Sequence, residues 1–309
     1  MIEARAVSKR YGERLAVDDL TFTVKPGAVT GFLGPNGAGK STTIRMIMGL
    51  DAPTSGRVTV NGRRYDRHPA PLHEVGALLE AKAVHTGRSA YNHLLALALT
   101  TGIPRRRVDE VIGLVGLTDV AGKRVGGFSL GMGQRLGVAA ALLGDPATLV
   151  LDEPVNGLDP QGILWIRRLL HNLAAEGRTV LVSSHLLSEM ALTAEHLIVI
   201  GKGRLIADTS VEEFIGQASR KSVRVRSPQA ADLRELLAGP DVSITSAEPG
   251  VLEVTGRSSA DIGRIACERS IPLEELVVVQ ASLEEAFMEL TEDALEYRVT
   301  EAAPERRAS

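Results

Sequence analysis

The sequence predicts an α/β protein with a parallel sheet at its centre. Over the first 215 residues, short apolar runs alternate with segments that have the spacing of helices. The chain contains 31 glycines and only 3% aromatic residues, a composition that suits tight turns and packing of Ala, Leu and Val. Because strands separated by helices pair in parallel, we expect the central strands to form a parallel sheet.

The elements of this first part follow from the apolar runs and from the turn signals between them. Lys25-Pro26-Gly27 and Val60-Asn61-Gly62 are typical of turns, and several helical segments end at glycine. We predict strands over residues 2–7, 20–24, 28–33, 57–60, 75–79, 148–151, 179–183, 197–200 and 204–207. We predict helices over residues 40–48, 90–100, 105–115, 130–143, 161–175, 186–195 and 211–218.

A second pattern begins after about Lys221. We predict, in chain order, a strand over 222–226, a helix over 230–238, strands over 242–245 and 251–255, a helix over 260–269, a strand over 276–279 and a helix over 283–290. The order βαββαβ is that of a small split β-α-β domain. We therefore expect a first domain at 1–218, a small α+β accessory domain at 219–292, and a polar, disordered tail at 293–309.

Composition excludes several classes of protein. The chain carries 35 Lys and Arg against 38 Asp and Glu, and this net charge of −3 gives no reason to expect nucleic acid as a partner. The single cysteine, Cys267, excludes an intramolecular disulfide and a zinc site of several cysteines, and it fits a reducing cytosol. The longest apolar stretches fall short of the roughly 18 residues that a membrane helix needs, so we expect no membrane span. The N-terminus also has no apolar core typical of a secretory signal.

The strongest motif lies between the strand predicted at 28–33 and the helix predicted at 40–48. It matches G-x-x-x-x-G-K-[ST], in which glycines let backbone N–H groups close around phosphates and the helix N-terminus adds a positive dipole. Lys40 would neutralise the terminal phosphates, and the Ser41 hydroxyl would bind Mg²⁺. The sequence therefore predicts a nucleoside triphosphate site formed by Gly34, Pro35, Asn36, Gly37, Ala38, Gly39, Lys40, Ser41 and Thr42. A glycine-rich turn that only fits the pattern is the alternative.

Two carboxylates, Asp152 and Glu153, follow the apolar strand predicted at 148–151. In a parallel sheet this strand brings both to the carboxyl edge, where the phosphate loop also lies. Asp152 would hold Mg²⁺ through water, and Glu153 would act as general base on the attacking water. Either carboxylate alone could instead cap the next segment. A phosphate loop by itself is compatible with kinases, GTPases and ATPases, so this second site is needed to choose between them.

Together these motifs make residues 1–215 resemble the nucleotide-binding subunit of an ABC transporter. The segment from Phe128 to Arg135 is similar to the signature loop of that family, which completes the ATP site of the opposite subunit. The Ser129 hydroxyl, the Gly131 backbone and the N-terminus of the following helix form an anion site that lacks a phosphate of its own. An ordinary serine cap beside a flexible glycine is the alternative for this segment.

The resemblance assigns roles to three further segments. Tyr11 is similar to the aromatic residue that stacks on adenine, although a surface tyrosine before a turn is the alternative. His185 is similar to the switch histidine that contacts the terminal phosphate and orients water, although a lone histidine at a strand end is often structural. Residues 156–159 are similar to the loop that contacts the other subunit.

The sequence departs from the usual family pattern at two places. Glu80 stands where the family usually has the glutamine that senses Mg²⁺, and it could still reach a metal through water. Leu130 and Met132 stand in the signature where glycine and glutamine are commonest. Both features, with a small appended domain, resemble the subfamily of bacterial drug, bacteriocin and antibiotic exporters.

The resemblance implies an ATPase that binds ATP and Mg²⁺, dimerises head to tail, and energises a separate integral-membrane permease for export of a drug, antibiotic or peptide. It implies a cytoplasmic protein, peripheral on the inner face of the membrane, that receives the permease around residues 80–94. An idle solvated loop is the alternative for that surface. Two other classes stay open, namely a soluble ABC-type ATPase acting on nucleic acid or ribosomes, and a P-loop kinase or GTPase. The net charge argues against the first class, and the lack of an Asn-Lys-x-Asp motif argues against a GTPase.

Overall fold

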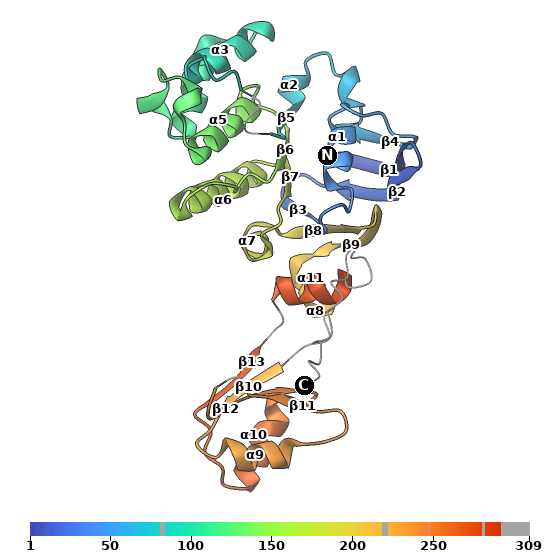
Figure 1. The fold of residues 1–309 in the computed structure, drawn as a ribbon, viewed down its shortest axis with the longest axis vertical. Helices are drawn as coiled ribbons and strands as arrows, with labels where there is room; N and C mark the ends of the chain where they lie inside the picture. The colour runs from blue at the N-terminus through green and yellow to red at the C-terminus, as the bar shows by residue number, and fades with distance from the viewer. Residues whose placement is uncertain (81–83, 218–221, 247, 280–281, 292–309) are drawn as a thin grey trace, which may run out of the picture. The chain divides into compact units, whose positions relative to one another are not determined.

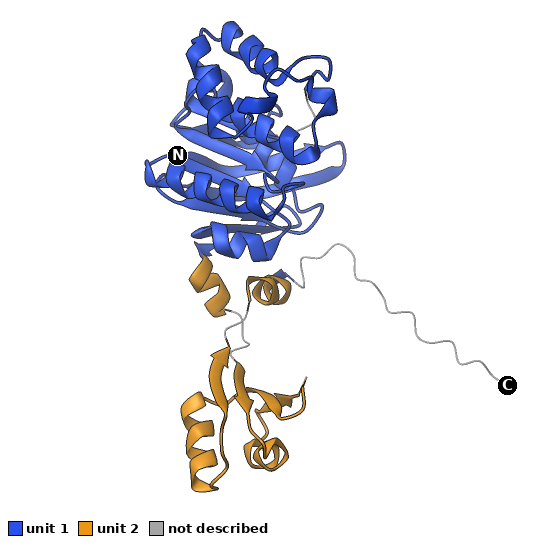
Figure 2. Cartoon of the chain, turned by 90° about the vertical axis from the view of Figure 1, so that its left-hand side faces the viewer, with its two compact units in different colours: residues 1–210, 291–309 blue, residues 211–290 orange. Residues whose placement is uncertain are grey.

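The computed structural model describes residues 1–80, 84–217, 222–246, 248–279 and 282–291, and Figure 1 shows their helices and strands. The chain forms two compact units, Met1–Ser210 and Val211–Leu290, coloured separately in Figure 2. Helix α8 (Val211–Gln217) is grouped with the second unit, whereas our sequence-based boundary at residue 218 assigns it to the first. The tail predicted at 293–309 lies outside the described residues.

The first unit is built on a six-stranded sheet with the strand order β5-β6-β7-β3-β8-β9. The strands from β5 to β8 pair in parallel, as expected from the alternation of strands and helices, and β9 is antiparallel to β8. Their bounds are β3 (Val29–Leu33), β5 (Val75–Leu78), β6 (Thr148–Asp152), β7 (Thr179–Ser183), β8 (His196–Gly201) and β9 (Arg204–Ser210). All residues of β3 and β7 are buried, which explains their continuous apolar runs.

The N-terminal part of this unit contributes a three-stranded antiparallel sheet with the order β2-β1-β4. It contains β1 (Ile2–Tyr11), β2 (Arg14–Val24) and β4 (Ser55–Val60). Both β1 and β2 are longer than predicted, because the register shifts and the left-handed backbone at Ala6 and Asp19 break the apolar alternation on which the prediction depended. The rings of Phe22 and Phe32 meet with centroids 5.7 Å apart in the core that joins this sheet to the central one.

The helices of the first unit begin and end within a few residues of the predicted bounds. They are α1 (Lys40–Ile47), α3 (Ala90–Thr100), α4 (Arg105–Leu114), α5 (Leu130–Leu142), α6 (Pro160–Ala175) and α7 (Leu187–Thr193). A short helix, α2 (Pro71–Glu74), was not predicted. Helices α3, α4 and α5 pack against one another, and α5 also packs on β5, while α6 packs on β3 and β7.

Side-chain caps explain where several helices begin. The hydroxyls of Ser89 and Ser129 accept hydrogen bonds from Asn92 N and Met132 N, and each therefore starts its helix at the next residue. Asp159 does the same for α6 through the Gly162 N–H, at 2.8 Å. The family resemblance placed Ser129 and residues 156–159 in functional loops, and both segments open helices that pack in the first unit.

The second unit has the predicted split β-α-β arrangement. Its elements are α8, β10 (Ser222–Arg226), α9 (Ala230–Leu237), β11 (Ser243–Thr245), β12 (Val251–Thr255), α10 (Ser259–Glu268), β13 (Glu275–Val279) and α11 (Leu283–Thr291). The strands form a four-stranded antiparallel sheet with the order β11-β12-β10-β13. Apolar side chains of β10, β12, α9 and α10 form its core. Among the described residues of both units, no helix is long and apolar enough to cross a membrane.

Candidate active site

The phosphate loop joins β3 to α1, as the sequence predicted. Gly37 and Gly39 have left-handed backbones, with φ of 83° and 102°. A Cβ on Gly39 would lie 2.6 Å from the Ala16 carbonyl oxygen, so glycine is required there by both conformation and space. No side chain caps the start of α1, and its first backbone N–H groups are thus directed to the loop, as in a site that binds anions.

A cavity of about 390 Å³ runs along this loop. It is lined by Tyr11, Arg14, Ala16, Pro35, Asn36, Gly37, Ala38, Gly39, Lys40, Ser41, Thr42, Asp152 and Glu153. The fold therefore brings the phosphate loop and both carboxylates to one cavity, although more than 100 residues separate them in the chain. Of the loop residues named from the sequence, Gly34 is outside the lining, because it lies against the Ile200 carbonyl oxygen.

Lys40 is one of two cationic residues, with Arg14, that line the cavity. Its ammonium group donates hydrogen bonds to the carbonyl oxygens of Gly34 and Pro35. Burial lowers the pKa of Lys40, while the charges of Glu153 and Asp152 act in the opposite direction. Lys40 is thus held inside the loop, facing the region in which phosphates would be bound.

Asp152 ends strand β6 and lies in register with Ser183 at the end of β7. The Ser183 hydroxyl donates a hydrogen bond to the Asp152 carboxylate. Burial raises the pKa of Asp152, and the neighbouring charge of Glu153 adds to this, against the opposing effects of Ser183 and Lys40. A bound cation would reverse this effect of burial, because it stabilises the ionised carboxylate.

The oxygens available here match the preference of Mg²⁺. The Ser41 hydroxyl and the Asp152 carboxylate line the same cavity, and Mg²⁺ binds hard oxygen ligands while keeping several waters. Glu80, the third predicted metal residue, is exposed just after β5 and is not among the residues that line the cavity. Ser41 and Asp152 thus fit a metal site together, whereas Glu80 stands apart from them.

Glu153 and His185 form a hydrogen-bonded pair. His185 Nδ1 lies 2.7 Å from Glu153 Oε2. The His185 side chain is 56% exposed and that of Glu153 is 24% exposed, and Glu153 is the member of the pair that lines the cavity. A carboxylate that is held by an imidazole and open to solvent can accept a proton from a water molecule.

Tyr11 lines the cavity, and its hydroxyl donates a hydrogen bond of 2.7 Å to Asp51. Arg45 also donates to Asp51, at 2.8 Å, and the Lys9 ammonium lies 5.0 Å from the centre of the Tyr11 ring. These contacts hold the Tyr11 side chain in place, and the residue as a whole is 45% exposed. The arrangement can receive a flat ring by stacking.

Ser129 and Gly131 lie away from the cavity that contains the phosphate loop of the same chain. Ser129 lines a separate, more apolar pocket with Val84, Phe128 and Leu130. Gly131 faces the loop after Glu153, because a Cβ there would lie 2.9 Å from the Gly157 carbonyl oxygen. The structure therefore does not bring the signature residues to the phosphate site of their own chain.

Sequence reasoning missed four residues that shape the site. Ser183 binds Asp152, Asp51 binds Tyr11, and the buried Gln134 side chain donates to the Glu153 carbonyl oxygen at 2.9 Å. Arg14 lines the cavity. Only Ser183 had a usable signal, since it ends a strand predicted to run parallel to the one that ends at Asp152. The other three depend on contacts between distant segments, which local patterns do not reveal.

Comparison with known proteins agrees with this fold. The family described as ABC transporter matches residues 17–156, an AAA domain family matches residues 122–191, and a domain of unknown function matches residues 221–284. The chain is 39% identical to an uncharacterised ABC transporter ATP-binding protein of Bacillus subtilis, covering 96% of this chain and 97% of that protein. It is 36% identical to a bacitracin transport ATP-binding protein of Bacillus licheniformis, covering 94% and 97%.

Shorter relatives and solved structures extend the comparison. A lantibiotic transport ATP-binding protein of Streptococcus pyogenes is 35% identical over 67% of this chain and 90% of its own length. The solved ATP-binding subunit of an ABC transporter superposes with a TM-score of 0.65 at 27% identity, covering 70% of this chain and 92% of that chain. A dimeric ATP-binding cassette bound to ADP and phosphate, at 22% identity and a TM-score of 0.62, shares the fold over 68% of this chain and 98% of its own.

The fold and the site define a P-loop ATPase with an ATP-binding cassette. The chain belongs to the ATP-binding proteins of ABC transporters. It is the ATP-binding and ATP-hydrolysing subunit of such a transporter, as the sequence predicted. This membership decides against a kinase or GTPase, and the relatives named above give no support to an ATPase that acts on nucleic acid.

Proposed function

We propose that this chain hydrolyses Mg-ATP as one half of a head-to-tail pair and thereby drives a separate permease that exports a peptide antibiotic or a drug. One observation carries the proposal: the cavity along the phosphate loop ends at Asp152 and Glu153, and Glu153 is hydrogen-bonded to His185. The relatives named for bacitracin and lantibiotic transport support the class of cargo.

Nucleotide binding in this proposal uses the full length of the cavity. The backbone N–H groups of the loop and the N-terminus of α1 surround the phosphates, and Lys40 neutralises their charge. Tyr11 stacks on the adenine at the other end, with its ring held by Asp51 and Arg45. Ser41 and Asp152 would hold Mg²⁺, which would supply positive charge beside the phosphate oxygens when bound.

Glu153 performs the proton transfer of hydrolysis. Its carboxylate accepts a proton from the attacking water, whose oxygen forms a bond to the γ-phosphorus. The bond from this phosphorus to the bridging oxygen breaks, the electron pair stays on that oxygen, and ADP and inorganic phosphate result. His185 orients the Glu153 carboxylate through Nδ1, and its second ring nitrogen is left to contact the terminal phosphate.

The positions of Ser129 and Gly131 support the head-to-tail pairing. Neither residue lines the phosphate cavity of its own chain, yet Ser129 caps a helix of 13 residues whose N-terminus favours an anion. A second copy that turns its signature loop toward this cavity would place that helix N-terminus against the terminal phosphate. Two ATP molecules would then be enclosed between two chains.

In this proposal the protein works on the cytoplasmic face of the membrane, attached through its permease. The attachment surface is the region around residues 80–94, which contains the exposed Glu80 and the start of α3. Glu80 would contribute to the metal site only when the two chains of the head-to-tail pair enclose ATP. The accessory domain at 219–292 has the split β-α-β fold, and we propose that it stabilises the pair.

The test is a crosslinked pull-down of the Glu153→Gln protein from detergent-solubilised membranes of its own cells in the presence of Mg-ATP. We expect ATP-dependent recovery of a polypeptide with several apolar stretches of about 20 residues. The Lys40→Ala protein is the matched control and should recover much less of it at the same ATP concentration, because it binds the nucleotide more weakly. Recovery of ribosomes or nucleic acid, or of this chain alone, would contradict the transporter assignment of the partner.

A further inference from the structure

The catalytic carboxylate proposed above belongs to a residue with an unusual backbone. Glu153 has a φ of 52°, in the left-handed region that residues other than glycine rarely adopt. Such a conformation persists only where the surroundings hold it in place. The contacts of the Glu153 backbone therefore determine where its carboxylate points.

Three neighbours hold this backbone through hydrogen bonds to its N–H group and its carbonyl oxygen. The Glu153 N–H donates to the carbonyl oxygen and the hydroxyl of Ser183, at 3.2 and 3.1 Å. The Glu153 carbonyl oxygen accepts a hydrogen bond of 2.9 Å from the side-chain amide of Gln134 and one of 3.2 Å from the Asn156 N–H, which lies three residues along the chain. Gln134 is only 4% exposed, so water does not readily replace its hydrogen bond.

Gln134 lies on α5, the helix that begins at the signature residues. Ser129 caps this helix, and Gln134 follows within its first two turns. A helix segment of this length moves as a rigid body, so the position of Ser129 and the position of the Gln134 amide are linked. The same helix thus carries a residue proposed to meet the partner's nucleotide and a residue that touches the catalytic segment of its own chain.

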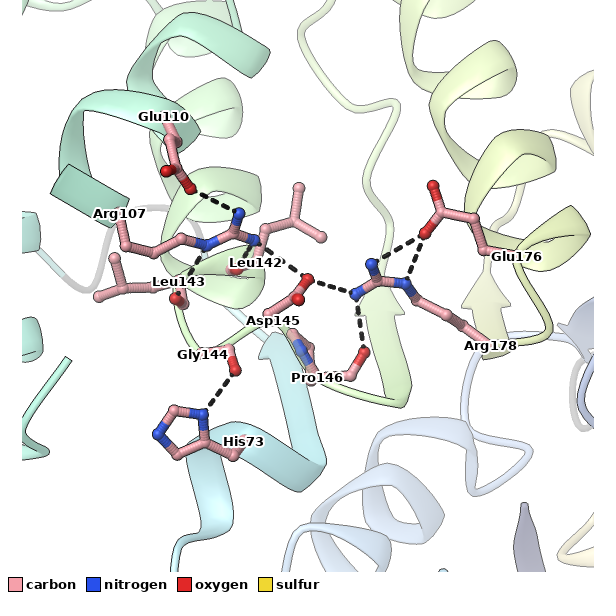
Figure 3. Close-up of polar contacts among 10 residues, drawn as sticks. All are labelled: His73, Arg107, Glu110, Leu142, Leu143, Gly144, Asp145, Pro146, Glu176 and Arg178. Atoms are coloured by element: carbon pink, nitrogen blue, oxygen red, sulfur yellow. Dashed lines mark hydrogen bonds and ion pairs between the residues drawn. The ribbon is translucent and has the colours of Figure 1, made fainter. Parts of the chain in front are cut away.

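The other end of α5 is anchored independently. Figure 3 shows Arg107, from α4, donating to the carbonyl oxygens of Leu142 and Leu143 at 2.9 and 3.3 Å. Asp145 then joins Arg107 to Arg178, at 3.2 and 2.9 Å. None of the residues of this anchor lines the phosphate cavity. The packing of the C-terminal end of α5 can therefore be changed without changing the contact between Gln134 and Glu153.

We infer that Gln134 is a positioning residue for ATP hydrolysis. It holds the Glu153 backbone so that the Glu153 carboxylate faces the attacking water. Helix α5, which begins at the signature residues, is thereby linked to the catalytic site of the same chain. The inference rests on the proposed role of Glu153 as general base. A buried glutamine that only satisfies a carbonyl oxygen would stabilise the fold without affecting the chemical step, so kinetics can distinguish the two roles.

The experiment measures ATP hydrolysis by the full-length Gln134→Met protein, which keeps the side-chain length and loses the donor. We expect kcat to fall about 10- to 100-fold, because a small misplacement of a catalytic group costs this much, with KM for ATP within about threefold. Gln134→Glu keeps the shape of the side chain and places a second acceptor against the Glu153 carbonyl oxygen, so its kcat should fall at least as much. Gln134→Glu also provides a second test of the inference if the Gln134→Met protein does not fold.

A double-mutant cycle gives the decisive readout. In the Glu153→Gln background, adding Gln134→Met should produce no further loss of single-turnover rate, because the carboxylate that it positions is already gone. Losses that multiply would overturn the inference, and so would an unchanged kcat in Gln134→Met. If Glu153→Gln alone retains normal turnover, the proposed function fails instead, and the two failures are therefore distinguishable.

Arg107→Met is the matched control, because it removes two hydrogen bonds to α5 carbonyl oxygens without touching Glu153. It should lower thermal stability and leave kcat per folded molecule within about twofold. An equal loss of kcat in this variant would show that any loosening of α5 slows hydrolysis, which would overturn the specific role of Gln134.

Discussion

His185 Nδ1 lies 2.7 Å from Oε2 of Glu153, although the two residues are 32 positions apart in the chain. The pair exists because β6 and β7 are adjacent and parallel, with Asp152 directly opposite Ser183. Glu153 is one residue beyond Asp152, and His185 is two residues beyond Ser183. Both residues therefore lie where β6 and β7 end, at the same edge of the sheet. The register of two strands thus brings the Glu153 carboxylate and the His185 imidazole together.

We predict that Glu153→Gln slows ATP hydrolysis by about 10²- to 10⁴-fold, the range lost when a general base is removed. ATP affinity should change little, because the amide keeps the shape of the side chain. Single-turnover hydrolysis and equilibrium nucleotide binding measure the two effects separately. Near-normal turnover would move the base to another residue, with His185 the first candidate.

His185→Ala should slow hydrolysis less than Glu153→Gln, since it removes a residue that orients the base. The two losses should not multiply when the substitutions are combined, because both act on one proton transfer. His196→Ala is a suitable control: this histidine binds Asp208 at 2.6 Å in the β8–β9 pair and does not line the cavity. Equal losses at His185 and His196 would contradict a specific role for His185.

Lys40→Ala should weaken ATP binding by at least about tenfold, because a charge-assisted contact to phosphate contributes roughly 1.5–3 kcal/mol. The Lys40 ammonium is also hydrogen-bonded to loop carbonyl oxygens, so the apo loop should lose some order as well. Titration with a fluorescent ATP analogue measures the affinity. Lys202→Ala, outside the cavity lining, is the charge-matched control, and unchanged affinity in Lys40→Ala would refute the phosphate site.

The Asp51 contacts predict a pH-dependent contribution to stability. Hydrogen bonds from Arg45 and Tyr11 lower the pKa of Asp51 from 3.8 to about 2. Because the folded pKa is below the unfolded one, this contribution is complete above the unfolded value and is lost as pH falls toward about 2. The difference in unfolding free energy between wild type and Asp51→Asn should therefore be largest above about pH 5 and shrink below pH 4.

Denaturant unfolding of both proteins across this pH range checks the prediction. Asp66→Asn is the control, because Asp66 also pairs with an arginine, Arg64, but does not contact Tyr11. A difference that grows on acidification would contradict the assignment. The Asp51→Asn protein should also bind ATP more weakly by a small factor, since the Tyr11 hydroxyl then donates to a neutral amide oxygen in place of a carboxylate.

The cluster around Asp145 predicts a backbone effect on stability. Asp145 has a φ of 54° and accepts hydrogen bonds from Arg107 and Arg178 (Figure 3). Asp145→Ala should destabilise the protein by about 1–3 kcal/mol, because alanine tolerates the left-handed region poorly. Asp145→Gly keeps the backbone conformation and loses only exposed ion pairs, which contribute about 0–1 kcal/mol. Equal destabilisation by both variants would assign the effect to the ion pairs instead.

Much of the fold could be predicted because its signals are local. Parallel strands such as β3 and β7 are buried on both faces and appear as continuous apolar runs, and Ser89 and Ser129 mark helix starts at which they cap N–H groups. The hairpin of β1 and β2 was predicted too short, since bulges break the alternation of side chains. The short helix α2 gave no periodic signal, because it has a single turn.

By itself, the sequence determined the phosphate loop, the carboxylates at the end of an apolar strand, and the order of the elements other than α2. These features depend on residues that are neighbours in the chain, and their chemistry is therefore visible without coordinates. Only the tertiary structure decided which distant groups meet: Ser183 with Asp152, Asp51 with Tyr11, and Gln134 with the Glu153 backbone. Such hydrogen bonds depend on strand register and helix packing to within about an ångström, and no local pattern carries that information.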